Sequence, residues 1–188
     1  MIYIQPTAVE DPWIIVEQYK KAAINAKEAG FDGVESRFFH GRWLESLELM
    51  HNHLVHGANG YLVTQFLDNT ANHRTDQWGG SVENRSRFGL EVLKAVKEVF
   101  GRNVSIKLSP AGGYNDVGYV TVVLFWPVIL IHCAYSMPLP ETVETYKYFI
   151  TEAEKLDLAY IVLVRYSSGL DLEFDGWCCL IPTKWALT

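Results

Sequence analysis

The chain has 188 residues, of which 49% are hydrophobic, and a formal net charge of -6. This length is typical of one domain, and the apolar content is sufficient for a sizeable core. The acidic balance argues against a nucleic-acid partner and favours a protein that binds a small molecule.

The cysteines and the most apolar run restrict the compartment. Cys133, Cys178 and Cys179 form neither a disulfide framework nor a zinc motif, so a reducing, cytoplasmic location is expected. The N-terminus has no secretory signal pattern. Val120 to Ala134 is the one membrane-like run, but its length of about 15 residues is below the roughly 18 to 20 needed to span a bilayer, and Pro127 interrupts it. No membrane association is therefore expected.

The first predicted elements are a helix and a strand. Asp11 and Pro12 are typical of the N-cap and first turn of a helix, and apolar residues at helical spacing continue it to Gly30. The segment 31–35 is predicted to be a short strand after a tight turn. Helix, turn and strand in this order are the repeating unit of an α/β protein.

The helix and strand pattern continues along the chain. In order, the sequence predicts a short helical turn at 62–67, a loop at 68–80, a helix at 82–100 with Ser81 as N-cap, a strand at 104–108, a helix at 141–155 and a strand at 158–164. The last strand is almost continuously apolar, which is typical of a strand buried in a parallel sheet. The expected fold class is therefore α/β, with parallel strands and outer helices.

Polar side chains gather where these strands end. His56, Asn59 and Tyr61 follow one strand, Lys107 and the loop after it belong to the next, and residues 165–166 follow the third. An imidazole and an amide can donate to a carbonyl oxygen, and a tyrosine can supply a proton, which is the chemistry that reduces an unsaturated carbonyl compound. By spacing alone, a structural histidine and a core tyrosine are the commoner interpretations of such residues.

Three stretches carry a family resemblance: FDGVE, the long run HGANGYLVTQFLDNTANHRTDQWGGSVENRSRFGLEVLKAVKEVFG, and VSIKLSPAGGYNDVG. Together they closely resemble the Old Yellow Enzyme family, and the run from Met137 to Tyr166 is similar to the family's following helix and strand. The resemblance implies a fragment of a TIM (β/α)8 barrel, roughly its middle βα units. It also implies FMN as cofactor, NADH or NADPH as reductant, and a small-molecule enone as substrate.

The resemblance also assigns roles to individual residues. His56 and Asn59 would hold the substrate's carbonyl oxygen, and Tyr61 would be the catalytic residue that protonates the α carbon after hydride transfer from flavin N5 to the β carbon. Lys107 stands where the family usually has arginine, and would place its charge beside flavin N1 and the C2 carbonyl. Lysine keeps that charge but lacks the planar fork of arginine. The run from Arg74 to Arg85 is interpreted mainly as a structural brace, held by ion pairs and caps.

The resemblance is interrupted at defined places. A single partial barrel domain is expected over 1–188, with family-like segments at 1–35, 56–118 and 137–176, atypical insertions at 36–55 and 119–136, and an atypical tail at 177–188. Removing the two insertions restores the family's continuity, which motivates the hypothesis that they are translated non-coding sequence. The first insertion is expected to break the strand that aims His56.

These departures leave a second interpretation of the function. A complete barrel has eight strands and about 250 residues, and this chain offers about three strands. The alternative to an FMN-dependent reductase is therefore a catalytically inactive truncated fragment, or a mis-spliced gene product, that does not bind FMN. The sequence does not distinguish NADH from NADPH, identify the physiological enone or set the oligomeric state.

Overall fold

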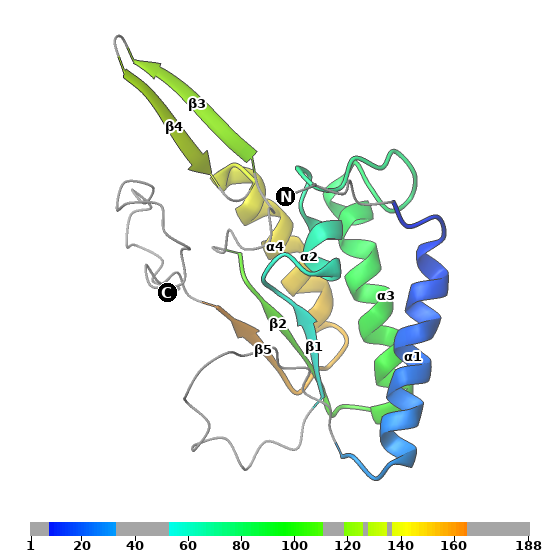
Figure 1. Cartoon of the computed structure of the whole chain (residues 1–188). Helices are drawn as coiled ribbons and strands as arrows, with labels where there is room; N and C mark the ends of the chain where they lie inside the picture. The colour runs from blue at the N-terminus through cyan, green and yellow to red at the C-terminus, as the bar shows by residue number, and fades with distance from the viewer. Residues whose placement is uncertain (1–7, 33–52, 111–118, 126–127, 135–136, 165–188) are drawn as a thin grey trace.

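The structure, a computed structural model, describes residues 8–32, 53–110, 119–125, 128–134 and 137–164 (Figure 1). The helices are α1 (Pro12–Glu28), α2 (Leu62–Leu67), α3 (Val82–Phe100) and α4 (Leu139–Glu154). The strands are β1 (His53–Gly57), β2 (Val104–Leu108), β3 (Tyr119–Phe125), β4 (Val128–Ala134) and β5 (Tyr160–Leu163).

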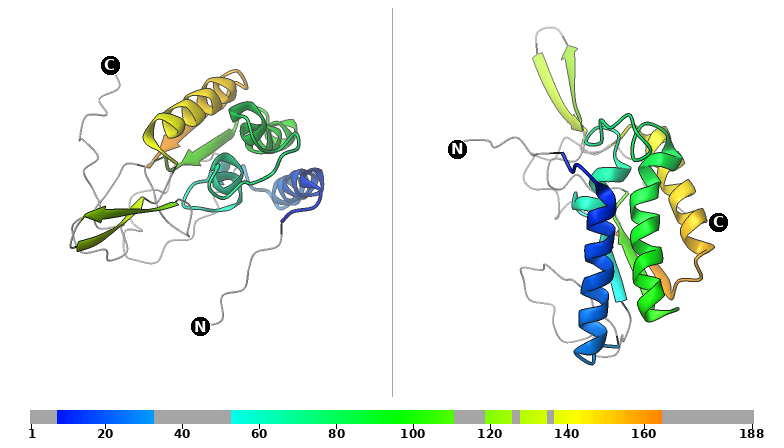
Figure 2. Two further views of the ribbon diagram at one scale, coloured as in Figure 1. Left: turned by 90° about the horizontal axis from the view of Figure 1, so that it is seen from above. Right: turned by 90° about the vertical axis from the view of Figure 1, so that its right-hand side faces the viewer.

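A three-stranded parallel sheet in the order β1-β2-β5 is the centre of the fold. Viewed from above, α1, α3 and α4 lie together on one side of this sheet (Figure 2). Parallel strands with helices on the outer face are the arrangement of a (β/α) barrel segment. The α/β fold class and its barrel-fragment form are therefore confirmed.

The core lies between the sheet and this helix layer. The largest fully buried side chains come from both layers: Phe88, Phe149, Leu67, Leu93, Ile106 and Leu108. Phe66 stacks on Phe88 with ring centroids 4.1 Å apart, and a Cβ on Gly89 would lie 2.7 Å from the ring of Phe149. The glycine thus allows α4 to pack closely on α3.

The helix ends follow the sequence signals. The Asp11 side chain accepts from the Trp13 amide and Pro12 stands in the first turn of α1, while the Ser81 hydroxyl accepts from the Asn84 amide at the start of α3. Gly101, at φ 63°, follows the last residue of α3. These caps satisfy amides that a helix start would otherwise leave without partners.

The strand before the histidine motif differs from the expectation. Residues 33–35 of the predicted strand lie outside the described residues, and Phe31 and Asp32 are not in a strand. Instead β1 begins at His53, so the last residues of the segment expected to be a foreign insertion form the strand that leads into His56. Val55 takes a buried position in it, and β1 pairs with β2 over its whole length. The expectation that the insertion breaks this strand was wrong, because the apolar residues Leu54 and Val55, directly before His56, can pair with β2.

The second insertion contains regular structure that the sequence analysis did not predict. Strands β3 and β4 form an antiparallel hairpin that pairs Tyr119 with Ala134 and Phe125 with Val128 (Figure 1). The membrane-like run thus lies largely in strands. Among the described residues, none of the helices is long and apolar enough to cross a membrane.

Candidate functional site

His56 and Lys107 lie side by side on neighbouring strands. They are register partners in the β1–β2 pair, and Val162 of β5 continues the same row across the sheet. Their sequence neighbours Val55 and Ile106 alternate to the opposite face and are buried. His56 and Lys107 therefore face away from the packed side of the sheet, near the C-terminal ends of their strands.

The surroundings of His56 favour its neutral form. Partial burial lowers the pKa of His56 below its ordinary value, and the charge of Lys107 lowers the pKa further. A neutral imidazole keeps one N–H donor and one acceptor nitrogen. Near neutral pH the histidine can thus donate a hydrogen bond to a carbonyl oxygen without carrying a charge.

A tight turn carries Asn59 and brings Tyr61 back to the histidine. Asn59 and Gly60 have φ values of 57° and 69°, and the Tyr61 amide donates to the Ala58 carbonyl at 3.3 Å. Two consecutive left-handed residues make this a turn of the kind that Asn-Gly pairs favour. The ring centroids of His56 and Tyr61 are consequently 4.9 Å apart.

Short polar contacts hold this turn on both sides. The Ser109 hydroxyl accepts from the Asn59 backbone amide at 2.7 Å. The side-chain amide of Gln65 donates to the Gly60 carbonyl at 2.8 Å. The buried Thr64 hydroxyl donates to the Gly57 carbonyl at the end of β1. Strand, turn and α2 are thereby fixed to one another. The sequence indicated Ser109 only as part of the loop after Lys107, and it did not indicate Thr64 or Gln65.

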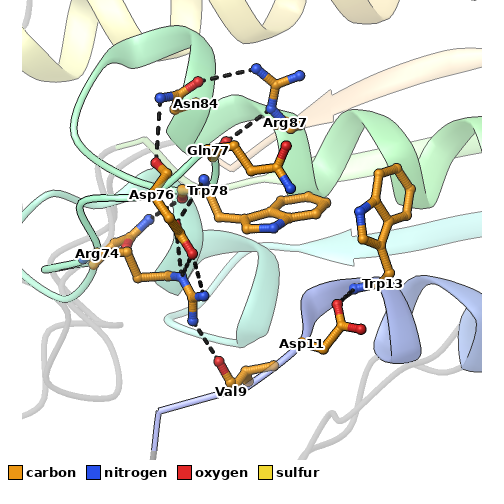
Figure 3. Close-up of polar contacts among 10 residues, drawn as sticks. Val9, Asp11, Trp13, Arg74, Asp76, Gln77, Trp78, Asn84 and Arg87 are labelled. Atoms are coloured by element: carbon orange, nitrogen blue, oxygen red, sulfur yellow. Dashed lines mark hydrogen bonds and ion pairs between the residues drawn. The ribbon is translucent and has the colours of Figure 1, made fainter.

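The run after the motif forms a brace, as predicted (Figure 3). The Arg74 guanidinium pairs with Asp76 at 2.5 Å and also donates to the Val9 carbonyl, which ties the loop to the segment that precedes α1. The Asp76 carboxylate accepts from the Trp78 amide at 3.0 Å, and Trp78 packs edge-on against Trp13 with ring centroids 5.1 Å apart. The pKa of Asp76 is lowered mainly by its hydrogen bond from Arg74.

Arg85 contributes to the brace differently from the expected ion pair. Its side chain is 6% exposed and donates to the carbonyls of Leu67 and Gly80 and to the Thr145 hydroxyl. These acceptors lie at the end of α2, before α3 and on α4. One guanidinium therefore joins three parts of the chain through neutral acceptors.

Asn72 is a brace residue that sequence reasoning missed. Its buried amide donates to the carbonyls of Phe66 and Trp78, both at 2.8 Å, and its oxygen accepts from the Arg74 amide. The polar sequence around Asn72 predicts a loop, but it does not indicate that the Asn72 side chain is buried. None of these hydrogen bonds of the brace involves His56 or Lys107.

Two hollows in the described surface lie elsewhere. One is lined by residues near the C-terminal ends of α1 and α3, such as Lys27 and Phe100, and the other by residues near the start of α3 and α4, such as Ser81 and Glu141. Neither includes His56, Asn59, Tyr61 or Lys107. In the described parts of the chain, no group of three or more His, Cys, Asp or Glu residues could hold a metal ion.

Parallel strands with an outer helix layer are the arrangement of a segment of a (β/α) barrel, a fold whose proteins carry their sites at the C-terminal ends of the strands. Residues 54–125 match the NADH:flavin oxidoreductase / NADH oxidase family. The solved structure of morphinone reductase is similar, with a TM-score of 0.61 and 32% identity over 89% of this chain and 37% of that one. The Old Yellow Enzyme from a Pichia species has a TM-score of 0.60 and 28% identity over 88% of this chain and 36% of that chain.

Curated relatives extend the likeness. A Claviceps fusiformis protein named "Probable inactive dehydrogenase easA" is 35% identical over 86% of this chain and 33% of its own length. A Leishmania infantum protein named "Probable flavin mononucleotide-dependent alkene reductase" is 46% identical over 58% of this chain and 25% of its own length. The chain thus spans about a third or less of the curated relatives that it matches. Residues 54–125 are thus similar to the NADH:flavin oxidoreductase / NADH oxidase family, and most of the chain is similar to about a third of morphinone reductase and of an Old Yellow Enzyme.

Proposed function

We propose that this chain carries the substrate-binding side of an FMN-dependent, NAD(P)H-driven reductase that acts on the C=C bond of α,β-unsaturated carbonyl compounds. The observation that carries the proposal is the group at the strand ends. His56 and Lys107 are register partners, the Tyr61 ring lies 4.9 Å from the His56 ring, and Asn59 occupies the turn between His56 and Tyr61. This set combines two carbonyl-binding donors, one proton donor and one cation.

The residues present fit FMN. Lys107 places a cation in the row, and its charge reaches the neighbouring imidazole strongly enough to lower the pKa of His56. A cation at this point would stabilise negative charge on the reduced cofactor. Bound FMN would supply the hydride that the β carbon of the substrate receives.

The chain's own groups would do the rest of the chemistry. The N–H of neutral His56 and the side-chain amide of Asn59 donate to the carbonyl oxygen, which draws electron density from the double bond. The Tyr61 hydroxyl gives its proton to the α carbon, so the product gains one hydride and one proton across the former double bond. Tyr61 is 39% exposed, which leaves its hydroxyl accessible to a substrate.

The names of relatives support this substrate class. An Oryza sativa protein that is 42% identical over 62% of this chain is named 12-oxophytodienoate reductase 1, and a solved morphinone reductase is described in complex with tetrahydroNAD. Both are reductases of small carbonyl compounds by name. We infer a small-molecule enone as substrate, a nicotinamide nucleotide as reductant and the cytoplasm as location.

A second candidate is a non-catalytic partial chain that binds no FMN. Two observations favour it: the described parallel sheet has three strands, and the chain spans 33% of a relative that is itself named inactive. A complete barrel closes its sheet with eight strands. The two candidates differ in whether the chain holds the cofactor.

Titration of the full chain with FMN separates the two candidates. The first predicts saturable quenching of flavin fluorescence at one FMN per chain, about tenfold weaker binding in Lys107→Met through loss of the cation, and no change in Lys94→Met. Lys94 is a suitable control because it lies on α3, is 51% exposed and pairs with Glu91. Absence of saturable binding in the unaltered chain would select the second candidate.

A further inference from the structure

The Asn59 backbone amide donates outside its own tight turn, to the Ser109 hydroxyl. In the turn from Ala58 to Tyr61, the closing bond joins the Tyr61 amide to the Ala58 carbonyl. Asn59 and Gly60 occupy the two central positions, both with positive φ. Asparagine is one of the few non-glycine residues that adopt this conformation readily, so the Asn-Gly pair itself favours the turn, and contacts from outside the turn decide how firmly it is held.

Ser109, the residue directly after β2, supplies the acceptor for the Asn59 backbone amide. Its hydroxyl oxygen accepts from the Asn59 amide at 2.7 Å, although the two residues are 50 positions apart. Ser109 directly follows β2 and is 2% exposed, and the register pair of Gly57 with Leu108 brings the two strand ends together. A short, partly buried hydrogen bond thus joins the end of β2 to the turn that follows β1.

The hydrogen bond between Asn59 and Ser109 lies close to His56 and Lys107 along the chain. Lys107 lies two residues before Ser109, and His56 lies three residues before Asn59, so one contact joins the two strand ends that carry the row. Without its acceptor the Asn59 amide would lose the stabilisation of this hydrogen bond, and the turn would be held less firmly against the end of β2. The direction of the Asn59 side chain would change with the backbone.

We propose that Ser109 is a positioning residue that fixes Asn59 in the left-handed conformation from which its side-chain amide can hold a substrate carbonyl. The part that concerns substrate rests on the proposed function, whereas the part that concerns the Asn59 backbone does not. Ser109 touches neither substrate nor cofactor in this account and acts only through Asn59.

Amide hydrogen exchange on the full chain, read by nitrogen–proton correlation NMR, tests the backbone part. Ser109→Ala should speed exchange of the Asn59 amide about threefold to tenfold, the range expected for one lost hydrogen bond. Thr142→Ala is the matched control, because it removes a buried hydroxyl that is bonded to the Met137 carbonyl at the start of α4 and not to the turn. It should leave the Asn59 amide unchanged relative to the other amides of the sheet. Equal exchange of the Asn59 amide in Ser109→Ala and the unaltered chain would overturn the proposal, as would equal acceleration in both variants.

A double-mutant cycle on cyclohexenone reduction tests the substrate part. Ser109→Ala should raise the KM for cyclohexenone about tenfold with a smaller effect on kcat, and should change KM less than about twofold when Asn59→Ala is already present. Additive effects would overturn the proposal. If the unaltered chain reduces no cyclohexenone, the proposed function fails, and the exchange of the Asn59 amide alone decides whether Ser109 positions the turn.

Discussion

Gly79 lies in the loop that begins at Arg74, at a point where the backbone leaves no room for a side chain. A Cβ on Gly79 would lie 2.2 Å from the Arg74 carbonyl oxygen and 2.6 Å from the Arg74 Cβ, while ordinary contact begins at 3.4 Å. Both obstacles belong to the rigid part of Arg74, so Gly79→Ala must push the two sides of the loop apart by about 1 Å. Overpacking of this kind costs about 1 to 3 kcal/mol. Because the shift also disturbs the Arg74 bond to Val9 and the packing of Trp78, we expect a loss near the upper end, about 3 kcal/mol.

The adjacent glycine is a matched control for this effect. Gly80 has φ 79°, and a Cβ there would meet nothing within 4 Å. Gly80→Ala therefore costs only the left-handed conformation, about 1 to 2 kcal/mol. Urea titrations followed by tryptophan fluorescence would give both free energies of unfolding, with Trp78 as a local reporter. The steric argument is refuted if Gly79→Ala destabilises the chain no more than Gly80→Ala.

Three further predictions concern buried or titrating charges. Arg85→Lys should lower the free energy of unfolding by about 2 to 3 kcal/mol, because an ammonium cannot reach all three neutral acceptors; an unchanged urea midpoint would contradict the role of the guanidinium. The pKa of Asp76 is lowered in the folded chain, so its pair with Arg74 stabilises the fold above the carboxyl's ordinary pKa and is lost as pH falls below it. Urea midpoints of Asp76→Asn should accordingly vary less with pH in the acid range, and an identical pH profile in the two chains would disprove this. Lys107→Met should raise the pKa of His56 toward its ordinary value but not fully, since burial remains the larger cause; NMR titration of the imidazole measures this, and a constant pKa would refute the coupling.

Local signals predicted the helices well. Asp11 and Ser81 mark the starts of α1 and α3 through side-chain acceptors that act within a few residues. The start of α4 was placed late, because Pro140 fits the first turn of a helix and extends it back to Leu139. Local chemistry of this kind can be read from sequence because the interacting atoms are close along the chain.

Contacts between distant segments could not be read in the same way. The bond from the Asn59 amide to Ser109 depends on the register of β1 with β2, and that register became visible only in the structure. The position of β1 was predicted wrongly for a related reason. The helix–turn–strand pattern favoured a strand at 31–35, whereas pairing with β2 uses the residues directly attached to His56. The substrate-binding and catalytic roles of His56, Asn59, Tyr61 and Lys107 remain predictions.

In the proposed function, Tyr61 protonates the substrate at an FMN-dependent site at the ends of β1 and β2. The most direct measurement is the rate at which cyclohexenone reoxidises the chain-bound reduced flavin, followed by stopped-flow absorbance in the unaltered chain, Tyr61→Phe and the control Tyr148→Phe on α4. We expect reoxidation in the unaltered chain, a loss of about 10²- to 10⁴-fold in Tyr61→Phe, and a near-normal rate in Tyr148→Phe. Flavin reduction by NAD(P)H should be nearly unchanged in Tyr61→Phe. Equal loss of both half-reactions in Tyr61→Phe, or no reoxidation by the enone in the unaltered chain, would contradict the claim.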